Sequence, residues 1–256
     1  MRIVAASVLS AEVLLAIAPR ERIAAVVDTA VDARWSMAAA AAEGVPRVGA
    51  GPEQLLTARP DLVICDPFTL PETLALLGSA GVPVVVTGDP ASFDDIAANV
   101  RRIGAWCHLQ APAERLVATM YERLHALAER AGDAAPFTVM CLDGALHTHG
   151  RGSLFDALVV AAGATNAAAA RGVGPFRKLD VEAVMSWRPD AIVVGANDGA
   201  TAVPEWLAGF PGVNRLPCVR DARVVRIPSP LLASTSHHLV EAAHQLQQQL
   251  VAWRRP

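Results

Sequence analysis

Aromatic side chains, charges and long apolar runs are all scarce in this chain. Of its 256 residues, 5% are aromatic and 18% are charged, and the net charge is −3. No run of basic residues occurs, so nucleic acid is not an expected partner. No apolar run reaches about 18 residues without a charge or a helix breaker, so no membrane span is expected. Hydrophobic residues make up 53% of the chain, which is enough for a sizeable core.

Enzyme and zinc motifs are missing as well. The chain has no Gly-x-Ser-x-Gly elbow and no P-loop, and neither Gly49-Ala-Gly51 nor Gly172-Val-Gly174 has the third glycine of a dinucleotide loop. The sequence contains no C-x-x-C pair, so buried free thiols are favoured over a zinc site and a disulfide stays open for Cys65, Cys107, Cys141 and Cys218. A catalytic triad could be assembled from Ser153, His147 and Asp156, but a chain of this length offers one by chance. We therefore do not expect an enzyme.

A long amphipathic helix is predicted over residues 111–131. Its apolar residues recur at helical spacing, and the charges lie on the opposite side. At 1.5 Å per residue this helix is about 30 Å long, the diameter of a small domain. The chain on either side alternates strands with helices, which is typical of α/β folds with mainly parallel sheets. We predict an N-terminal α/β lobe (1–108), a linking helix (109–134) and a C-terminal α/β lobe (135–256).

The expected strands are short and apolar, as in covered parallel sheets. They cover residues 2–5, 23–27, 62–65, 84–87, 138–142, 191–194 and 224–227. The expected helices cover residues 11–17, 35–43, 52–58, 70–79, 92–103, 153–161, 181–186, 205–208 and 235–253. The apolar start of the chain is a little like a signal peptide, but Glu12 interrupts it and no cleavage site follows.

An internal repeat relates the two lobes. Residues 53–64 read EQLLTARPDLVI and residues 182–193 read EAVMSWRPDAIV. In each copy a glutamate begins a helix, Arg-Pro-Asp ends it and an apolar strand follows. Because the same order of elements surrounds both copies, duplication is the better interpretation than chance.

Ligands of parallel sheets bind beyond the carboxyl ends of the strands, so two such lobes would hold a ligand in a cleft between them. Four of the seven histidines fall in loops expected at those ends. Imidazole is a good ligand for iron, cobalt or zinc, although a lone surface histidine is usually only solvated. The candidate metal ligands are His147, His149, His237 and His238.

Five stretches stand in order around the long helix: RIVAASVLSAEVLLAIA, VPRVGAGPEQLLTARPDLVIC, GRGSLFDALVVAAGATN, LDVEAVMSWRPDAIVVG and VRDARVVRIP. Together they resemble the helical-backbone substrate-binding proteins of ABC importers, which carry cobalamin, ferric siderophores or haem. The resemblance implies two lobes with little hinge motion. It also implies one glutamate on each lobe, here Glu53 and Glu182, that docks into arginine pockets of a two-fold permease. The alternative interpretation is that Glu53 and Glu182 have no docking role and are acidic residues in the first turn of a helix, where the helix dipole favours a negative charge.

The resemblance also suggests which other side chains contact ligand. Aromatic rings often contact ligand in this family, and a flat macrocycle would stack on Trp35, with Trp206 and Phe68 as further candidates. Arg34 and Arg151 would pair with an anionic ligand or be solvated. Haem binders of the family often use a tyrosine from a lobe loop, but the only tyrosine, Tyr121, is on the linking helix, so a haem site would have to use histidine. The loops expected at the cleft also contain few tryptophans, whereas the cleft of cobalamin binders is typically rich in them.

The expected function is capture of a metal chelate and delivery to an ABC permease dimer, by a monomer without intrinsic cofactor that binds an iron or cobalt chelate. The alternatives are direct binding of Zn²⁺, Mn²⁺ or iron ions by the four histidines, and a cytoplasmic carrier or sensor of a chelate. The expected location is periplasmic or membrane-anchored if a signal was removed, and cytoplasmic if Met1 is the native start.

Overall fold

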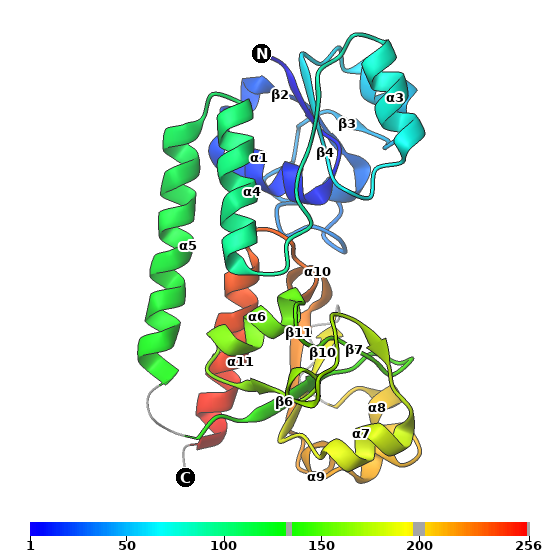
Figure 1. The fold of residues 1–256 in the computed structure, drawn as a ribbon, viewed down its shortest axis with the longest axis vertical. Helices are drawn as coiled ribbons and strands as arrows, with labels where there is room; N and C mark the ends of the chain where they lie inside the picture. Colours follow the sequence, from blue (N-terminus) through cyan, green and yellow to red (C-terminus); the bar gives the residue numbers. More distant parts are fainter. Residues whose placement is uncertain (132–134, 197–202, 255–256) are drawn as a thin grey trace. The chain divides into compact units, whose positions relative to one another are not determined.

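The computed structural model describes residues 1–131, 135–196 and 203–254, and it divides the chain into two compact units. Unit 1 comprises Met1–Tyr121 and Ser234–His238, and unit 2 comprises Glu122–Ala233 and Leu239–Pro256. The division falls inside helix α5 (Gln110–Ala131), the long helix expected from the sequence (Figure 1). The three-part division at residues 108 and 134 stays a prediction.

Unit 1 is built on a parallel sheet of five strands. Its strands are β1 (Ile3–Ala5), β2 (Ile23–Val27), β3 (Arg47–Val48), β4 (Leu62–Cys65) and β5 (Val84–Val86), in the order β3-β2-β1-β4-β5. The chain order reverses between β1 and β4, which is where parallel sheets commonly bind ligands. The covering helices are α1 (Val8–Ile17), α2 (Pro52–Thr57), α3 (Pro71–Ser79) and α4 (Phe93–Trp106). Short 3₁₀ turns occur at Arg20–Arg22 and Asp28–Val31.

Unit 2 has a parallel sheet of four strands and a separate antiparallel ribbon. The sheet runs in the order β11-β10-β6-β8, from β6 (Thr138–Cys141), β8 (Thr165–Asn166), β10 (Ala191–Ala196) and β11 (Val224–Pro228). The ribbon pairs β7 (His147–Thr148) with β9 (Arg177–Lys178). The helices are α6 (Leu154–Ala161), α7 (Val181–Trp187), α8 (Glu205–Gly209), α9 (Pro217–Arg220), α10 (Ser229–Leu232) and α11 (Leu239–Arg254), with 3₁₀ turns at Ala169–Arg171 and Val213–Arg215. The prediction of two α/β units with mainly parallel sheets is confirmed.

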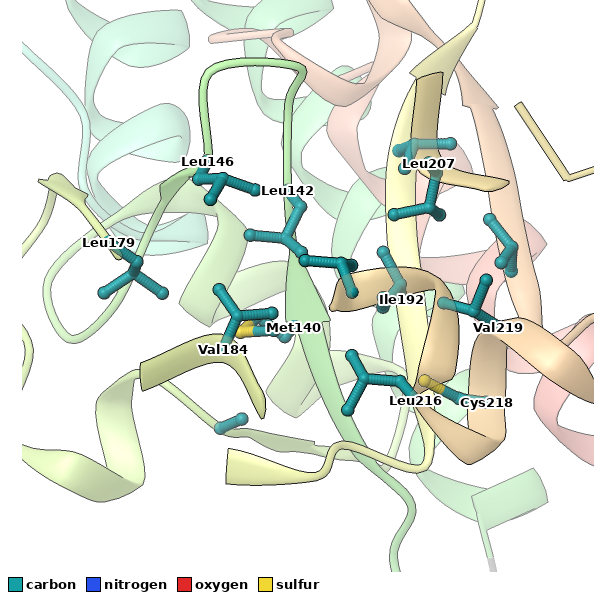
Figure 2. Close-up of a cluster of buried hydrophobic side chains, with 14 residues drawn as sticks. Met140, Leu142, Leu146, Leu179, Val184, Ile192, Leu207, Leu216, Cys218 and Val219 are labelled. Atoms are coloured by element: carbon teal, nitrogen blue, oxygen red, sulfur yellow. The ribbon is translucent and has the colours of Figure 1, made fainter. Parts of the chain in front are cut away.

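One part of the core of unit 2 lies between its sheet and helices α7 to α9. Figure 2 shows Met140 and Ile192 of the central strands among the buried side chains of this cluster. Leu146 and Leu179, which lie next to the two strands of the ribbon, belong to the same cluster. The ribbon is therefore anchored at one end in the core. No helix in the described part of the chain has the length and apolar character needed to cross a membrane.

The repeated Arg-Pro-Asp segments form the same turn in both units. Arg59 and Arg188 end helices α2 and α7 with left-handed backbone, at φ of 49° and 45°. The carboxylate of Asp61 then accepts from the backbone N–H of Arg2 at 2.6 Å, next to β1. Asp190 accepts in the same way from Thr138 of β6 at 2.8 Å. In each unit the turn thus ties the start of one strand to the start of its neighbour, as expected of a duplicated unit.

Two expected helices differ in the structure. The Ala-rich segment 35–43 forms successive turns rather than a helix, because the side chains of Glu12 and Ser36 take up the backbone N–H groups of Met37 and Ala38. The C-terminal helix begins at Leu239 rather than at residue 235. There, the side chain of Ser236 instead donates to the Glu12 carboxylate.

The side-chain hydrogen bonds of the repeated turn lead to a prediction about stability. Replacing Asp190 with alanine should lower the free energy of unfolding by about 1 kcal/mol, because the N–H of Thr138 loses its side-chain partner. Asp61→Ala should have a similar effect through Arg2. Urea denaturation would measure both. The matched control is Asp221→Ala, an exposed aspartate with no side-chain hydrogen bond among the described residues, and a loss as large in that variant would contradict the explanation.

Candidate functional site

Unit 1 contains a pocket of about 270 Å³ at the carboxyl ends of its strands. The lining comes from the loops after β1, β2, β4 and β5, together with Ala50 and Thr235. The expected position beyond the strand ends is therefore occupied by a cavity in this unit. Helix α1 begins at this pocket, where the hydroxyl of Ser7 accepts from Ser10 N–H and caps the helix.

The pocket wall is polar and acidic. Its charged residues are Asp66 and Asp89, and its other polar side chains are Ser7, Thr29, Thr87 and Thr235. Thr87 is buried, and its hydroxyl has no hydrogen-bond partner among the described residues. A buried hydroxyl without a partner is costly, so Thr87 is suited to bind a polar group of a ligand.

Phe68 is the sequence-predicted aromatic that lines this pocket. It is 75% exposed and lies in a turn held by Asp66, which accepts from Phe68 N–H and from the Thr69 hydroxyl. Trp35 is also exposed, but it is not among the lining residues. Arg34 is engaged within the protein, because its guanidinium donates to Asp32 at 2.6 Å. A ligand would have to compete with Asp32 for Arg34.

Glu12, which we did not predict as a functional residue, organises the loops of unit 1. Its side chain is buried within helix α1. The carboxylate accepts hydrogen bonds from the Ser36 hydroxyl, the Met37 N–H and the Ser236 hydroxyl. These donors hold the loop of Trp35 and the segment Ser234–His238 against the helix. A single acid inside an apolar helix was the sequence signal for such a residue.

His237 and His238 lie in the segment that Glu12 holds. Their rings stack with centroids 4.1 Å apart, and the backbone N–H of His238 donates to Ser236. Both residues are half-buried and belong to unit 1, whereas His147 and His149 belong to unit 2. Among the residues that the structure describes, no group of three or more histidine, cysteine or acidic side chains could hold a metal ion.

The ribbon of unit 2 gathers the other two histidines around Phe176. The ring of His147 is centred 4.9 Å from that of Phe176, and the ring of His149 lies 5.4 Å away. Phe176 is 61% exposed. Phe176 could not be predicted from the sequence, because only the pairing of β7 with β9 brings it beside the histidines.

Both imidazoles of the ribbon are held in one orientation. His147 Nδ1 lies 2.9 Å from the carboxylate of Asp143, and His149 Nδ1 lies 3.1 Å from the carbonyl oxygen of Pro175. Because these oxygens accept hydrogen bonds, Nδ1 carries the hydrogen in each ring. The Nε2 atoms then hold the lone pairs, which is the arrangement of metal-ligating histidines whose other nitrogen is fixed by an acceptor.

The local electrostatics favour this orientation at His147. Partial burial raises the pKa of the Asp143 carboxyl, but hydrogen bonds from the backbone and ring of His147 and from Ala145 N–H outweigh it and hold the pKa below its usual value. Asp143 therefore stays ionised at neutral pH and accepts the Nδ1 hydrogen.

The other predicted residues have varied surroundings. Trp206 packs partly buried against the unit 2 core, while Arg151 is exposed and its backbone N–H donates to Val173. Tyr121 donates to Asp94 at 2.5 Å, from helix α5 to helix α4. The four cysteines are free thiols in this structure, and Cys65, Cys107 and Cys218 are buried. Burial raises the pKa of the Cys65 thiol to about 11, so it is unreactive at neutral pH.

Glu53 and Glu182 occupy equivalent places in the two units. Each is the second residue of its helix, α2 or α7, and each is exposed. Neither carboxylate has a hydrogen bond or ion pair within the described residues. Both side chains are therefore accessible to a partner.

A family model described as periplasmic binding protein matches residues 3–231. The uncharacterized ABC transporter substrate-binding lipoprotein YvrC of Bacillus subtilis is 25% identical over 207 residues, which are 77% of this chain, and the chain spans only 64% of that relative's length.

Two of the solved structures that are similar over nearly the whole chain are haem-binding proteins. The periplasmic heme-binding protein RhuT from Roseiflexus sp. RS-1 is 26% identical with a TM-score of 0.82, and the match covers 97% of this chain and 98% of RhuT. The periplasmic heme-binding protein HutB of Vibrio cholerae is 22% identical with a TM-score of 0.84, and 98% of each chain is covered. At that identity the likeness to HutB concerns the fold alone.

The close approach of two backbone segments at Gly150, next to the ribbon, leads to a second prediction. A Cβ at Gly150 would lie 2.3 Å from the carbonyl oxygen of Val173 and 2.8 Å from that of Gly174. Gly150→Ala should therefore separate the segments that carry His149 and Phe176 and lower the free energy of unfolding by about 1–3 kcal/mol. Urea denaturation and faster hydrogen exchange at the Leu179 amide, which donates to Leu146, would measure this effect.

The matched control is Gly144→Ala in the preceding loop, where an added Cβ meets nothing within 4 Å. Its stability should stay within about 0.5 kcal/mol of wild type. Equal stability of the Gly150 variant would contradict the close approach on which the ribbon rests.

Proposed function

Because this chain belongs to the periplasmic binding protein family, we propose that it is the substrate-binding protein of an ABC importer and that it captures an iron chelate of the haem or siderophore type. The family match over residues 3–231 supports binding and transport rather than catalysis. One relative reported above is named for ABC transport and RhuT is named for haem, so iron is a better supported metal than cobalt.

The ligand class is supported most directly by the two oriented histidines beside Phe176. An exposed aromatic ring offers a stacking surface to a flat ligand, and the Nε2 atoms of His147 and His149 offer lone pairs to its metal. Both rings contact Phe176, so His147 and His149 lie on the same side of the ribbon and cannot ligate one metal from opposite sides of a macrocycle. We assign ligation to His147, whose ring is held in one orientation by a carboxylate partner at Nδ1.

The number of available donors favours a chelate over a bare ion. A structural or transported transition metal ion needs about four ligands from the protein. The described residues contain no group of three such side chains, whereas a metal already held by a macrocycle needs only one or two axial donors. The alternative of a bare metal ion held by four histidines receives no support.

The partner that fits this function is the extracytoplasmic face of a two-fold ABC permease. Glu53 and Glu182 are repeated, exposed carboxylates at helix starts, and arginine side chains recognise carboxylates with paired hydrogen bonds. The relative named as a lipoprotein supports an extracytoplasmic location.

A hemin titration tests the ligand site. Purified wild-type protein should bind hemin with a shifted Soret band and, once reduced, should show the absorption spectrum of a five-coordinate haem with one histidine ligand. His147→Ala should lose that spectrum, and Asp143→Asn should weaken binding by about 10-fold, because the fixed orientation of the imidazole is lost.

The control is His125→Ala, an exposed histidine on helix α5 that pairs with Glu129. It should bind hemin as wild type does. An unchanged spectrum in the His147→Ala, His149→Ala double variant would overturn the site. Binding of a ferric siderophore but not of hemin would retain the importer and change the ligand.

The permease contact is tested separately. A double variant, Glu53→Ala with Glu182→Ala, should lose uptake and permease association while its ligand affinity stays unchanged, because neither carboxylate lies in the binding residues described above. A matched control is Glu205→Ala, an exposed glutamate that also begins a helix. Unchanged uptake by the double variant would contradict the docking role.

A further inference from the structure

Lys178 is the only lysine among the 22 basic residues of the chain, and it stands directly opposite His147 in the ribbon. The register pairs His147 with Lys178 and Thr148 with Arg177. Side chains directly opposite each other on antiparallel strands lie on the same face, with Cβ atoms about 5 Å apart. Lys178 is thus a direct neighbour of the proposed metal ligand.

The two faces of the ribbon are distinguished by burial. Leu146, Thr148 and Leu179 are buried, and the N–H of Leu179 donates to the carbonyl of Leu146 at 2.9 Å. Because side chains alternate along a strand, the opposite face carries His147 and Lys178. The ring contacts of Phe176 with both histidines place Phe176 on that same face.

The ammonium group of Lys178 is available to a ligand. Lys178 is exposed, and no hydrogen bond or ion pair joins its side chain to another described residue. The nearby Asp180 is engaged elsewhere, since its carboxylate caps helix α7 at Ala183. Asp143 is occupied by His147.

We propose that Lys178 binds a carboxylate at the periphery of the chelate whose metal His147 ligates, so that the preferred cargo is an anionic, carboxylate-bearing macrocycle. This inference rests on the proposed function. The flexible four-carbon stem of lysine lets its charge follow a group several ångströms from the metal. A chelate without carboxylates would gain nothing from Lys178, which makes this residue a determinant of specificity.

The test compares two ligands with three proteins. Hemin carries free carboxylates, and its dimethyl ester carries none. Lys178→Gln should weaken hemin binding by about three- to five-fold, as expected for a partly exposed ion pair, and should leave binding of the ester unchanged. Lys178→Arg should retain most of the hemin affinity.

The matched control is Arg177→Gln, which removes a positive charge one residue away on the opposite face. It should weaken binding of both ligands equally or not at all. An equal loss for hemin and ester in Lys178→Gln, or the same selectivity change in Arg177→Gln, would overturn the inference.

The hemin and ester measurements separate the metal site at His147 from the role of Lys178. If His147→Ala abolishes binding of hemin and ester while Lys178→Gln does not discriminate between them, the metal site stands and the role of Lys178 falls. If wild-type protein binds neither ligand, both fall for this class of cargo.

The single lysine allows a second measurement. Apart from the α-amino group, Lys178 is the only amine that acetic anhydride can acylate in this sequence. Saturating hemin should slow acetylation of Lys178 several-fold in mass spectra of the digested protein, while the ester should protect it less. Equal labelling with and without hemin would contradict a contact at Lys178.

Discussion

Each unit depends on the burial of a parallel sheet whose central strands are apolar on both faces. Strands β1, β2 and β4 are buried throughout, so their backbone groups must pair within the sheet and the chain must return through covering helices. All carboxyl ends of the strands then meet at one edge. Polar side chains that could not enter the sheet collect in the loops there, and the pocket of unit 1 is lined by those loops.

Two local arrangements position the candidate functional side chains on these sheets, one in each unit. In unit 1, three donors from distant segments converge on the buried carboxylate of Glu12, which would be costly to bury alone. In unit 2, the ribbon is held at Leu146 and Leu179 by the core, while its other face carries the histidines. Both arrangements use a well-packed element to hold residues that do not contribute to the core themselves.

The sequence predicted the regular parts of this structure and missed the parts that depend on tertiary contacts. The long helix, the parallel strands and the repeated turn at Asp61 and Asp190 could be predicted, because each leaves a local pattern of apolar spacing or turn residues. The ribbon could not, since two residues per strand carry no periodicity and the pairing joins residues about 30 positions apart. Without that pairing, Phe176 and Lys178 had no connection to His147, although the histidines themselves were predicted. The helix predicted over residues 35–43 was wrong for a related reason. The hydrogen bond from the N–H of Met37 to the Glu12 carboxylate is favoured there over the helix preference of the alanines.

The presence of one lysine among so many arginines is informative for the ribbon. Arginine side chains in this protein repeatedly bind its own backbone carbonyls or carboxylates, as Arg22 does with Cys107 and Arg34 with Asp32. The planar guanidinium favours such fixed, multiple hydrogen bonds, whereas the lysine ammonium is a mobile point charge. A lysine at position 178 keeps a positive charge beside His147 that can follow a ligand. An arginine there would keep that charge, but its guanidinium would favour a carboxylate in one fixed geometry.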